Sequence, residues 1–244
     1  MLGRAASAAA TLVVSQTIFS CSADATGVDG GDSSDTIPAG SGNTSCVLTA
    51  SLTEGPYFVD ERLLRSDIRA DSSTGAISAG IPLDLTFNVG RLSGGACTPL
   101  TGAYLDVWHC DAAGVYSDES ANNSSGRKFL RGYQITDASG VAKFTTVYPG
   151  WYSGRAVHIH FKLRLFAGAT RTYEFTSQFF FDEALTSVVH AASPYNTRGT
   201  RNTRNSTDGI YNGLTTAQKS ALTLSTTKTT DGYSGVINLT VNLG

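Results

Sequence analysis

Two of the four histidines in the chain stand two residues apart, at His158 and His160. Residues i and i+2 of a β-strand project from the same face, so an extended segment here points both imidazoles the same way. The alternate positions Ile159, Phe161 and Leu163 are apolar and predict that the opposite face of the strand lies against the core. A His-x-His pair on one strand face is a common arrangement of metal ligands. Two solvated surface histidines give the same pattern, so the pair alone leaves both interpretations open.

A tyrosine and an arginine close to the pair add candidate groups. Tyr152 and Arg155 lie in the turn-forming segment PGWYSGR, shortly before His158, so the chain can bend back and bring the phenol over the histidine face. A second phenol, Tyr116, ends the turn DAAGVY. The sequence has no Cys-x-x-Cys ladder and no His-Glu-x-x-His motif, so the common structural and protease zinc sites are not indicated.

Segments of alternating apolar and polar residues predict the β-strands that must position these groups. Clusters of Gly, Asn, Asp and Ser separate them, and a short helix is expected over 182–192 with Asp182 as its N-cap. Strands at this spacing indicate a sandwich or a barrel. The fold we predict is all-β, a single β-sandwich domain with long loops and one or two short helices. The predicted strands cover residues 81–89, 103–108, 141–147, 157–166, 173–181 and 236–243.

Charge and hydropathy exclude some classes of protein. The chain of 244 residues has 18 Lys plus Arg against 20 Asp plus Glu, a net charge of −2. This balance argues against a nucleic-acid-binding protein, which needs a basic surface. No run reaches the roughly 18–20 apolar residues that a membrane-spanning helix needs.

The N-terminal residues predict export from the cytoplasm. Arg4 is the only charged residue before Asp24, and the small and apolar residues between them are typical of a secretory signal peptide over 1–20. Residues 21–45 contain four Asp and no Lys or Arg, which predicts a disordered tether before a folded domain over 46–244. The segment IFSC resembles a bacterial lipoprotein cleavage box, so membrane attachment through a lipidated Cys21 and plain secretion both stay open.

The remaining cysteines are Cys46, Cys97 and Cys110. In an oxidising compartment we expect two of these three to pair. If Cys21 carries no lipid, two disulfides can form. The sequence does not choose between the pairings.

Three longer segments resemble the intradiol ring-cleavage dioxygenases: DVWHCDAAGVYS, FLRGYQITDASGVAKF and TVYPGWYSGRAVHIHFK. EGPYF at 54–58 is similar to the N-terminal segment of that family, and PYNTRG at 194–199 is typical of its secreted branch. The resemblance runs from about Cys46 to the C-terminus. Members of the family hold non-haem Fe(III) with two Tyr and two His, and they insert O2 between the two hydroxyl-bearing carbons of a catechol.

The resemblance implies a ligand for iron at each of four positions, Tyr116, Tyr152, His158 and His160. It makes Tyr152 and His160 axial, and the other two equatorial beside a hydroxide. Fe(III) is a small, hard ion that oxygen donors suit, and a trivalent cation strongly favours the phenolate form of tyrosine. Two phenolates and a hydroxide balance its charge.

The resemblance also implies roles for groups around the iron. Tyr152 takes a catechol proton as a base that the metal releases. Arg155 stabilises negative charge on the substrate ring. Gln178 hydrogen-bonds the substrate or Arg155, and Tyr57 lines the substrate pocket. The implied product is a cis,cis-muconate-type diacid.

Other polar and aromatic residues are expected to be structural. We expect packing roles for Trp108 and Tyr104, a structural role for His109, and a surface position on the predicted helix for His190. A basic loop, expected to be solvated, salt-bridged or at the border of the pocket, contains Arg198, Arg201 and Arg204.

Two alternative functions fit parts of the sequence. An exported, non-catalytic sandwich module that binds aromatic or carbohydrate polymers fits the tether and the aromatic residues around 148–152. All four presumptive ligands and Arg155 count against it, because a binding module does not need them. A His-x-His zinc hydrolase is a third hypothesis, but no carboxylate ligand or general base is evident near the motif.

Overall fold

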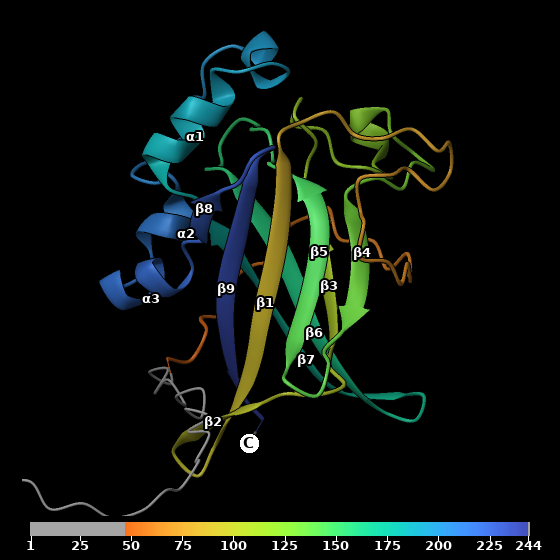
Figure 1. Cartoon of the computed structure of the whole chain (residues 1–244), viewed down its shortest axis with the longest axis vertical. Coiled ribbons are helices and arrows are strands. Elements are labelled where there is room, and N and C mark those ends of the chain that lie inside the picture. The colour runs from red at the N-terminus through yellow and green to blue at the C-terminus, as the bar shows by residue number, and fades with distance from the viewer. Residues whose placement is uncertain (1–46, 244) are drawn as a thin grey trace, which may run out of the picture. The chain divides into compact units, whose positions relative to one another are not determined.

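The structure, a computed structural model, describes residues 47–243. The predicted signal peptide, tether and lipid attachment at Cys21 therefore lie outside the described residues, as does Cys46. The described chain forms two β-sheets that pack face to face around a shared apolar core (Figure 1). The predicted all-β sandwich is confirmed.

The first sheet is organised around its longest strand, β1. Strand β9 runs parallel to β1, while β5 and β2 pair antiparallel with the first and second halves of β1. The alternation in the sequence has its expected cause, because Leu83, Leu85 and Phe87 are buried in the core while Asp84 and Asn88 are exposed. The strands of this sheet are β1 (Pro82–Ser93), β2 (Ala96–Pro99), β5 (Val141–Val147), β8 (Ser225–Lys228) and β9 (Tyr233–Asn242).

The second sheet carries the two histidines. Its strand order is β4-β3-β6-β7, and all neighbouring pairs are antiparallel. The inner face of β6 presents Ile159, Phe161 and Leu163 to the core, as predicted. The strands are β3 (Tyr104–Trp108), β4 (Arg131–Ile135), β6 (His158–Ala167) and β7 (Thr170–Phe180).

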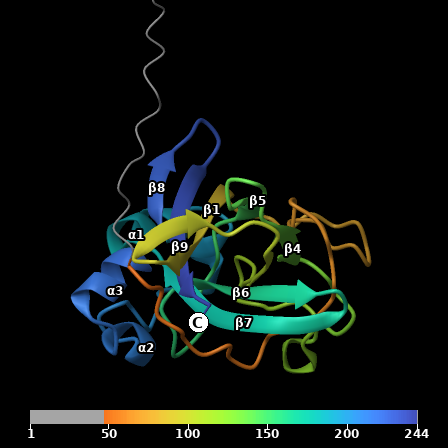
Figure 2. The same ribbon diagram turned by 90° about the horizontal axis from the view of Figure 1, so that it is seen from below.

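The outer face of the second sheet is covered by residues 53–64, which we call the strap. Figure 2 shows the chain before and within this segment running along the side of β6 and β7 that faces away from β1 and β9. Backbone hydrogen bonds attach it at both ends, from Leu52 N to Thr176 O at 3.1 Å and from Tyr133 N to Leu63 O at 2.8 Å. The histidine face of β6 is therefore buried beneath the strap.

Short helices gather beside β8, at one side of the sandwich (Figure 1). Helix α1 (Glu183–His190) confirms the predicted helix, and the side chain of Asp182 caps it by accepting from Leu185 N at 2.8 Å. Helices α2 (Gly209–Asn212) and α3 (Thr216–Ala221) follow, with 3-10 turns at Ser120–Asn122 and Tyr195–Arg198. None of the helices in residues 47–243 is long and apolar enough to cross a membrane.

All six predicted strands are present, and the sequence prediction missed three others. Strands β2 and β8 have only four residues, and β4 contains a glycine and begins with a buried arginine, Arg131. Cys110 is a free, buried thiol, whereas Cys97 is disulfide-bonded. This excludes Cys110 from the pairings that the sequence left open.

Candidate metal centre

Strand β6 brings the two imidazoles of the His-x-His pair together. The Nε2 atoms of His158 and His160 lie 3.0 Å apart, and both side chains are almost completely buried. His158 Nδ1 donates to the carbonyl oxygen of Ala156 at 2.6 Å, which leaves its Nε2 with a lone pair. The ring of His160 stacks on Trp108 of β3, with 5.0 Å between the centroids. Both rings are thus held in one orientation.

Two tyrosines join the imidazoles. Tyr152 Oη lies 3.1 Å from His158 Nε2. The Tyr116 ring lies 5.7 Å from that of Tyr152 and 6.4 Å from that of His160. The Tyr116 hydroxyl is buried and has no hydrogen-bond partner of normal geometry among residues 47–243. Because buried polar groups in proteins are nearly always paired, this hydroxyl points to a partner outside the described residues, such as a bound ion.

Burial controls the protonation of all four groups. It raises the pKa of Tyr152 to about 12, against the opposing charge of Arg155, and holds the pKa of Tyr116 well above 10. It lowers the pKa of His158 to about 3, assisted by Arg155, and puts the pKa of His160 well below 6.5. At neutral pH the chain alone therefore presents neutral imidazoles and neutral phenols. A bound cation would lower the pKa of the two phenols, because it favours the phenolate form.

The donor set fits a hard, highly charged metal ion. Donor atoms about 2.1 Å from one ion and at right angles to each other lie about 3.0 Å apart, close to the separations of 3.0 and 3.1 Å around His158 Nε2. In the described part of the chain, no group of three or more His, Cys, Asp or Glu residues could hold a metal ion. Four donors therefore require the two phenol oxygens. Phenolate oxygen and imidazole nitrogen are hard donors that suit Fe(III). Structural zinc sites instead are usually rich in cysteine sulfur.

Arg155 and Gln178 lie beside this cluster. Gln178 is opposite His160 in the β6–β7 register and is fully buried. Its Oε1 accepts a hydrogen bond from the Arg155 guanidinium, and its Nε2 donates to Thr53 O at 3.4 Å. Gln178 therefore fixes one side of the guanidinium and connects it to the strap.

Asp208 fixes the other side of Arg155, and the sequence analysis missed it. Its Oδ2 accepts from Arg155 Nε at 2.9 Å and from Ala156 N at 2.7 Å. Its Oδ1 accepts from the first backbone N–H groups of α2, Ile210 and Tyr211, at 2.8 Å each. Burial opposes ionisation of this carboxyl, but these donors and Arg155 hold its pKa below 3.8. The Asp-Gly pair after a polar run is a sequence signal for an N-cap, but nothing in it indicates contact with Arg155.

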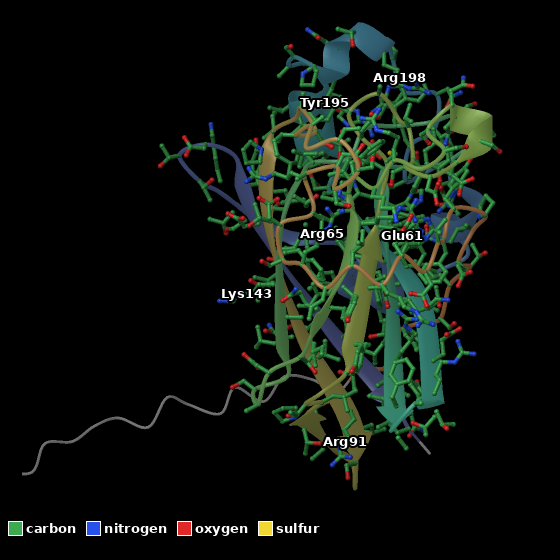
Figure 3. All side chains as sticks on the ribbon, turned by 90° about the vertical axis from the view of Figure 1, so that its right-hand side faces the viewer. Glu61, Arg65, Arg91, Lys143, Tyr195 and Arg198 are labelled. Carbon is green, nitrogen blue, oxygen red and sulfur yellow. The ribbon has the colours of Figure 1, made fainter. Side chains whose placement is uncertain are left out.

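The strap forms a wall of the site. Tyr57 stacks on Tyr116 with 4.4 Å between the ring centroids. Gly55 has φ +69°, and a Cβ at this position would lie 3.5 Å from His160 Cε1. Figure 3 shows the strap, with Glu61 labelled, crossing in front of the second sheet.

Two cations on β6 hold the strap in place. Lys162 pairs with Glu54 and lies 3.9 Å from the centroid of the Phe58 ring. Arg164 pairs with Asp60 at 2.9 Å. Both cations occupy the same strand face as the histidines, so they position the wall directly beside the metal-ligand candidates.

The three residues His109, Trp108 and His190, which the sequence analysis placed outside the site, are all at least partly buried. His109 is buried and accepts from Thr146 Oγ1 at 2.7 Å. Trp108 is buried as expected, but its ring stacks on His160 and so also orients a site residue. The surface position expected for His190 is wrong, because it is half-buried and donates to Pro149 O at 3.0 Å.

The basic loop is salt-bridged. Arg201 and Arg204 both pair with Glu183, at 3.2 and 3.3 Å. Arg198 lies over the ring of Trp151 at 5.0 Å. Trp151 packs with the main core rather than with the tyrosine cluster, so none of these contacts brings the loop to the candidate metal centre.

Comparison with known proteins finds the same family throughout. A family model described as "Dioxygenase" matches residues 53–204. An intradiol ring-cleavage dioxygenase from Tetranychus urticae is 30 % identical with a TM-score of 0.68, over 81 % of this chain and 96 % of that one. The dioxygenase domain of a dioxygenase–carbohydrate-binding fusion from Streptomyces sp. SirexAA-E is 27 % identical with a TM-score of 0.57, over 81 % and 100 %.

A curated relative is matched over a shorter stretch. The catechol 1,2-dioxygenase of Candida albicans is 33 % identical over 114 residues, which are 44 % of this chain and 35 % of the relative. This chain therefore aligns with about a third of that protein's length.

Proposed function

Because this chain belongs to the intradiol ring-cleavage dioxygenase family, we propose that it cleaves catechol-type aromatic rings with O2 at a non-haem Fe(III) centre. The proposed products are cis,cis-muconate-type diacids. The observation that carries the proposal is the cluster of two imidazoles and two phenols, in which the buried Tyr116 hydroxyl has no hydrogen-bond partner among the described residues.

In this proposal Tyr116, Tyr152, His158 and His160 hold the iron. Bound there, Fe(III) would be a Lewis acid that favours the phenolate forms of Tyr116 and Tyr152 and would make the aromatic substrate more reactive toward O2. The hydrogen bond from His158 Nδ1 to Ala156 O keeps the Nε2 lone pair directed into the cluster.

The other residues bind the substrate and manage its protons and charge. Tyr152 is half-buried whereas Tyr116 is fully buried, so Tyr152 Oη is the phenol oxygen better placed to accept a proton from an arriving catechol. The Arg155 guanidinium, fixed by Gln178 and Asp208, stabilises negative charge on the ring. Tyr57 borders the substrate on the strap side and excludes water there.

The non-catalytic module has less support. Tyr116, His158 and His160 are buried, and Tyr152 and Arg155 are partly buried, so these side chains offer little surface to a polymer. A neutral phenol buried without a hydrogen bond also costs stability that a pure binding module has no reason to lose. The zinc hydrolase has the weakest support, because no carboxylate contacts the described imidazoles.

An oxygen electrode with product analysis tests the proposal. We expect the iron-loaded protein to consume O2 and catechol in equal amounts and to release a colourless diacid that keeps every ring carbon. His160→Ala should abolish both signals, whereas His190→Ala, which removes a histidine outside the cluster, should keep them. A ring-opened semialdehyde, or O2 uptake that survives His160→Ala, contradicts the proposal.

A further inference from the structure

The outer face of the second sheet carries a second group of aromatic side chains, beyond the strap. Tyr104 pairs with Arg164 in the β3–β6 register, four residues along β3 from the Trp108–His160 pair. Its ring stacks on Tyr133 at 5.5 Å and contacts Phe166 edge-on at 4.9 Å. Phe166 is 38 % exposed. Tyr104 therefore has the packing role expected for it, but the partly exposed Phe166 leaves this end of the face open.

These rings border a cavity of about 510 Å³, which we call the Tyr104 cavity. Arginines contribute its charge: Arg62, Arg164 and Arg171 line it, against one carboxylate, Asp60. Two carboxylates just outside the lining also pair with these arginines, Asp106 with Arg164 and Glu174 with Arg171.

The three arginines differ in how many of their guanidinium N–H donors are free to bind a ligand. Arg164 is saturated, because it pairs with Asp106 as well as Asp60. The Arg62 side chain is 85 % exposed, and its recorded ion-pair contact is to Asp60 at 3.8 Å, beyond hydrogen-bond distance. Arg171 is 55 % exposed and pairs through one nitrogen with Glu174. Arg62 and Arg171 therefore have N–H donors free for an anion.

We propose that the Tyr104 cavity is a binding site for a one-ring aromatic carboxylate. The ring lies against Tyr104 and Phe166, and the carboxylate bonds to the guanidinium groups of Arg62 and Arg171. Flat aromatic faces next to planar, charged donors match such a ligand in both shape and charge. The volume lies within the usual range for small-molecule sites. This site does not depend on the proposed ring cleavage, since it shares none of the metal-ligand candidates.

Isothermal titration calorimetry with benzoate tests the site. We expect wild-type protein to bind benzoate with a Kd of about 1 mM or tighter, and benzamide, which lacks the charge, at least about fivefold more weakly. Arg62→Gln combined with Arg171→Gln should weaken benzoate about fivefold or more. Arg91→Gln, an exposed arginine of β1 in the other sheet (Figure 3), should leave the affinity unchanged.

Phe166→Leu separates ring recognition from charge. It keeps an apolar side chain but removes the flat aromatic face. The affinity for benzoate should therefore fall, while the affinity for cyclohexanecarboxylate should not. Equal benzoate affinity in wild type and in the Arg62, Arg171 double variant overturns the proposal and assigns any binding to another site, such as the metal centre. Absence of benzoate binding to wild type also overturns it. Ring-cleavage activity of Phe166→Leu should stay at the wild-type level, because Phe166 lies outside the strap and outside the metal-ligand candidates.

Discussion

At the scale of single residues, the Tyr116 hydroxyl is expected to affect metal binding and folding stability in opposite directions. It is buried, and none of the residues that the structure describes pairs with it. Replacing it with Phe removes an unsatisfied polar atom, so Tyr116→Phe should raise the unfolding free energy of the metal-free protein by about 1 kcal/mol. The same change should sharply weaken Fe(III) binding. Chemical unfolding of metal-free protein and a ferric titration measure the two effects.

Tyr148 provides the matched control for that experiment. Its buried hydroxyl is paired with Thr186 Oγ1 at 2.7 Å. Tyr148→Phe should therefore lower stability by about 1 kcal/mol and leave ferric binding unchanged. If Tyr116→Phe instead destabilises the metal-free protein as Tyr148→Phe does, the hydroxyl has a partner within the chain and is not reserved for a metal.

Asp208 determines how Arg155 is held. Asp208→Asn keeps the shape and one acceptor oxygen but removes the charge that faces Arg155 Nε. We expect kcat for catechol to fall about tenfold or more, because a mobile guanidinium stabilises ring charge less well. Asp182→Asn alters another helix-capping carboxylate, one that contacts α1 and not Arg155. It should leave kcat unchanged; equal kcat values in the two variants would rule out a positioning role for Asp208.

At the scale of elements, the strap depends on buried cations of β6. Lys162 is almost fully buried between the strap and the sheet. Lys162→Met keeps the length of the side chain but removes its pairing with Glu54, so the strap should open more often. We expect faster tryptic cleavage after Arg62 and a KM for catechol raised about threefold. Lys143→Met, at an exposed position of β5 (Figure 3), is the control and should change neither; cleavage as slow as wild type in Lys162→Met would show that other contacts hold the strap.

His109 links the two sheets and predicts a pH dependence. It follows β3, and its Nε2 bonds to Thr146 of β5. Burial lowers its pKa to about 4. Between about pH 6.5 and about pH 4 the unfolded chain binds a proton on the His109 imidazole and the folded chain does not. The free energy of unfolding therefore falls as the pH drops through this range.

His109→Gln should remove this contribution. The variant is expected to be less stable than wild type at pH 7, because it perturbs two hydrogen bonds. The free energy of unfolding of metal-free wild type, relative to that of the metal-free variant, should then fall by about 3 kcal/mol between pH 7 and pH 4. Urea unfolding at several pH values measures it. A difference that stays constant with pH would mean that folding leaves the pKa of His109 unchanged.

At the scale of the whole molecule, local pattern predicted more of the sandwich than of the site. The alternation of residues 81–89 and 157–166 follows directly from one face packing on the core, and so it was readable from the sequence. Strand β4 was not, because Arg131 is buried beneath the strap rather than in the core. Such burial depends on a tertiary contact with Tyr57, far away in the sequence.

The same distinction applies to the candidate metal centre. The His-x-His pair and the turns at Tyr116 and Tyr152 are local features, and the resemblance to a known family supplied their roles as iron ligands and Gln178. Asp208 lies 53 residues from Arg155, and Asp60 lies 104 residues from Arg164. Pairs at these separations carry no local signal and are set only when the sheets and the strap assemble.

The iron content and visible absorption of the purified protein test the central claim most directly. The account predicts about one Fe(III) per chain and a tyrosinate-to-Fe(III) band in the visible range, which moves to longer wavelength when catechol is added without O2. Tyr173→Phe, a tyrosine outside the cluster, should keep the band. A protein that stays colourless after ferric reconstitution would contradict the assignment of Tyr116 and Tyr152 as iron ligands.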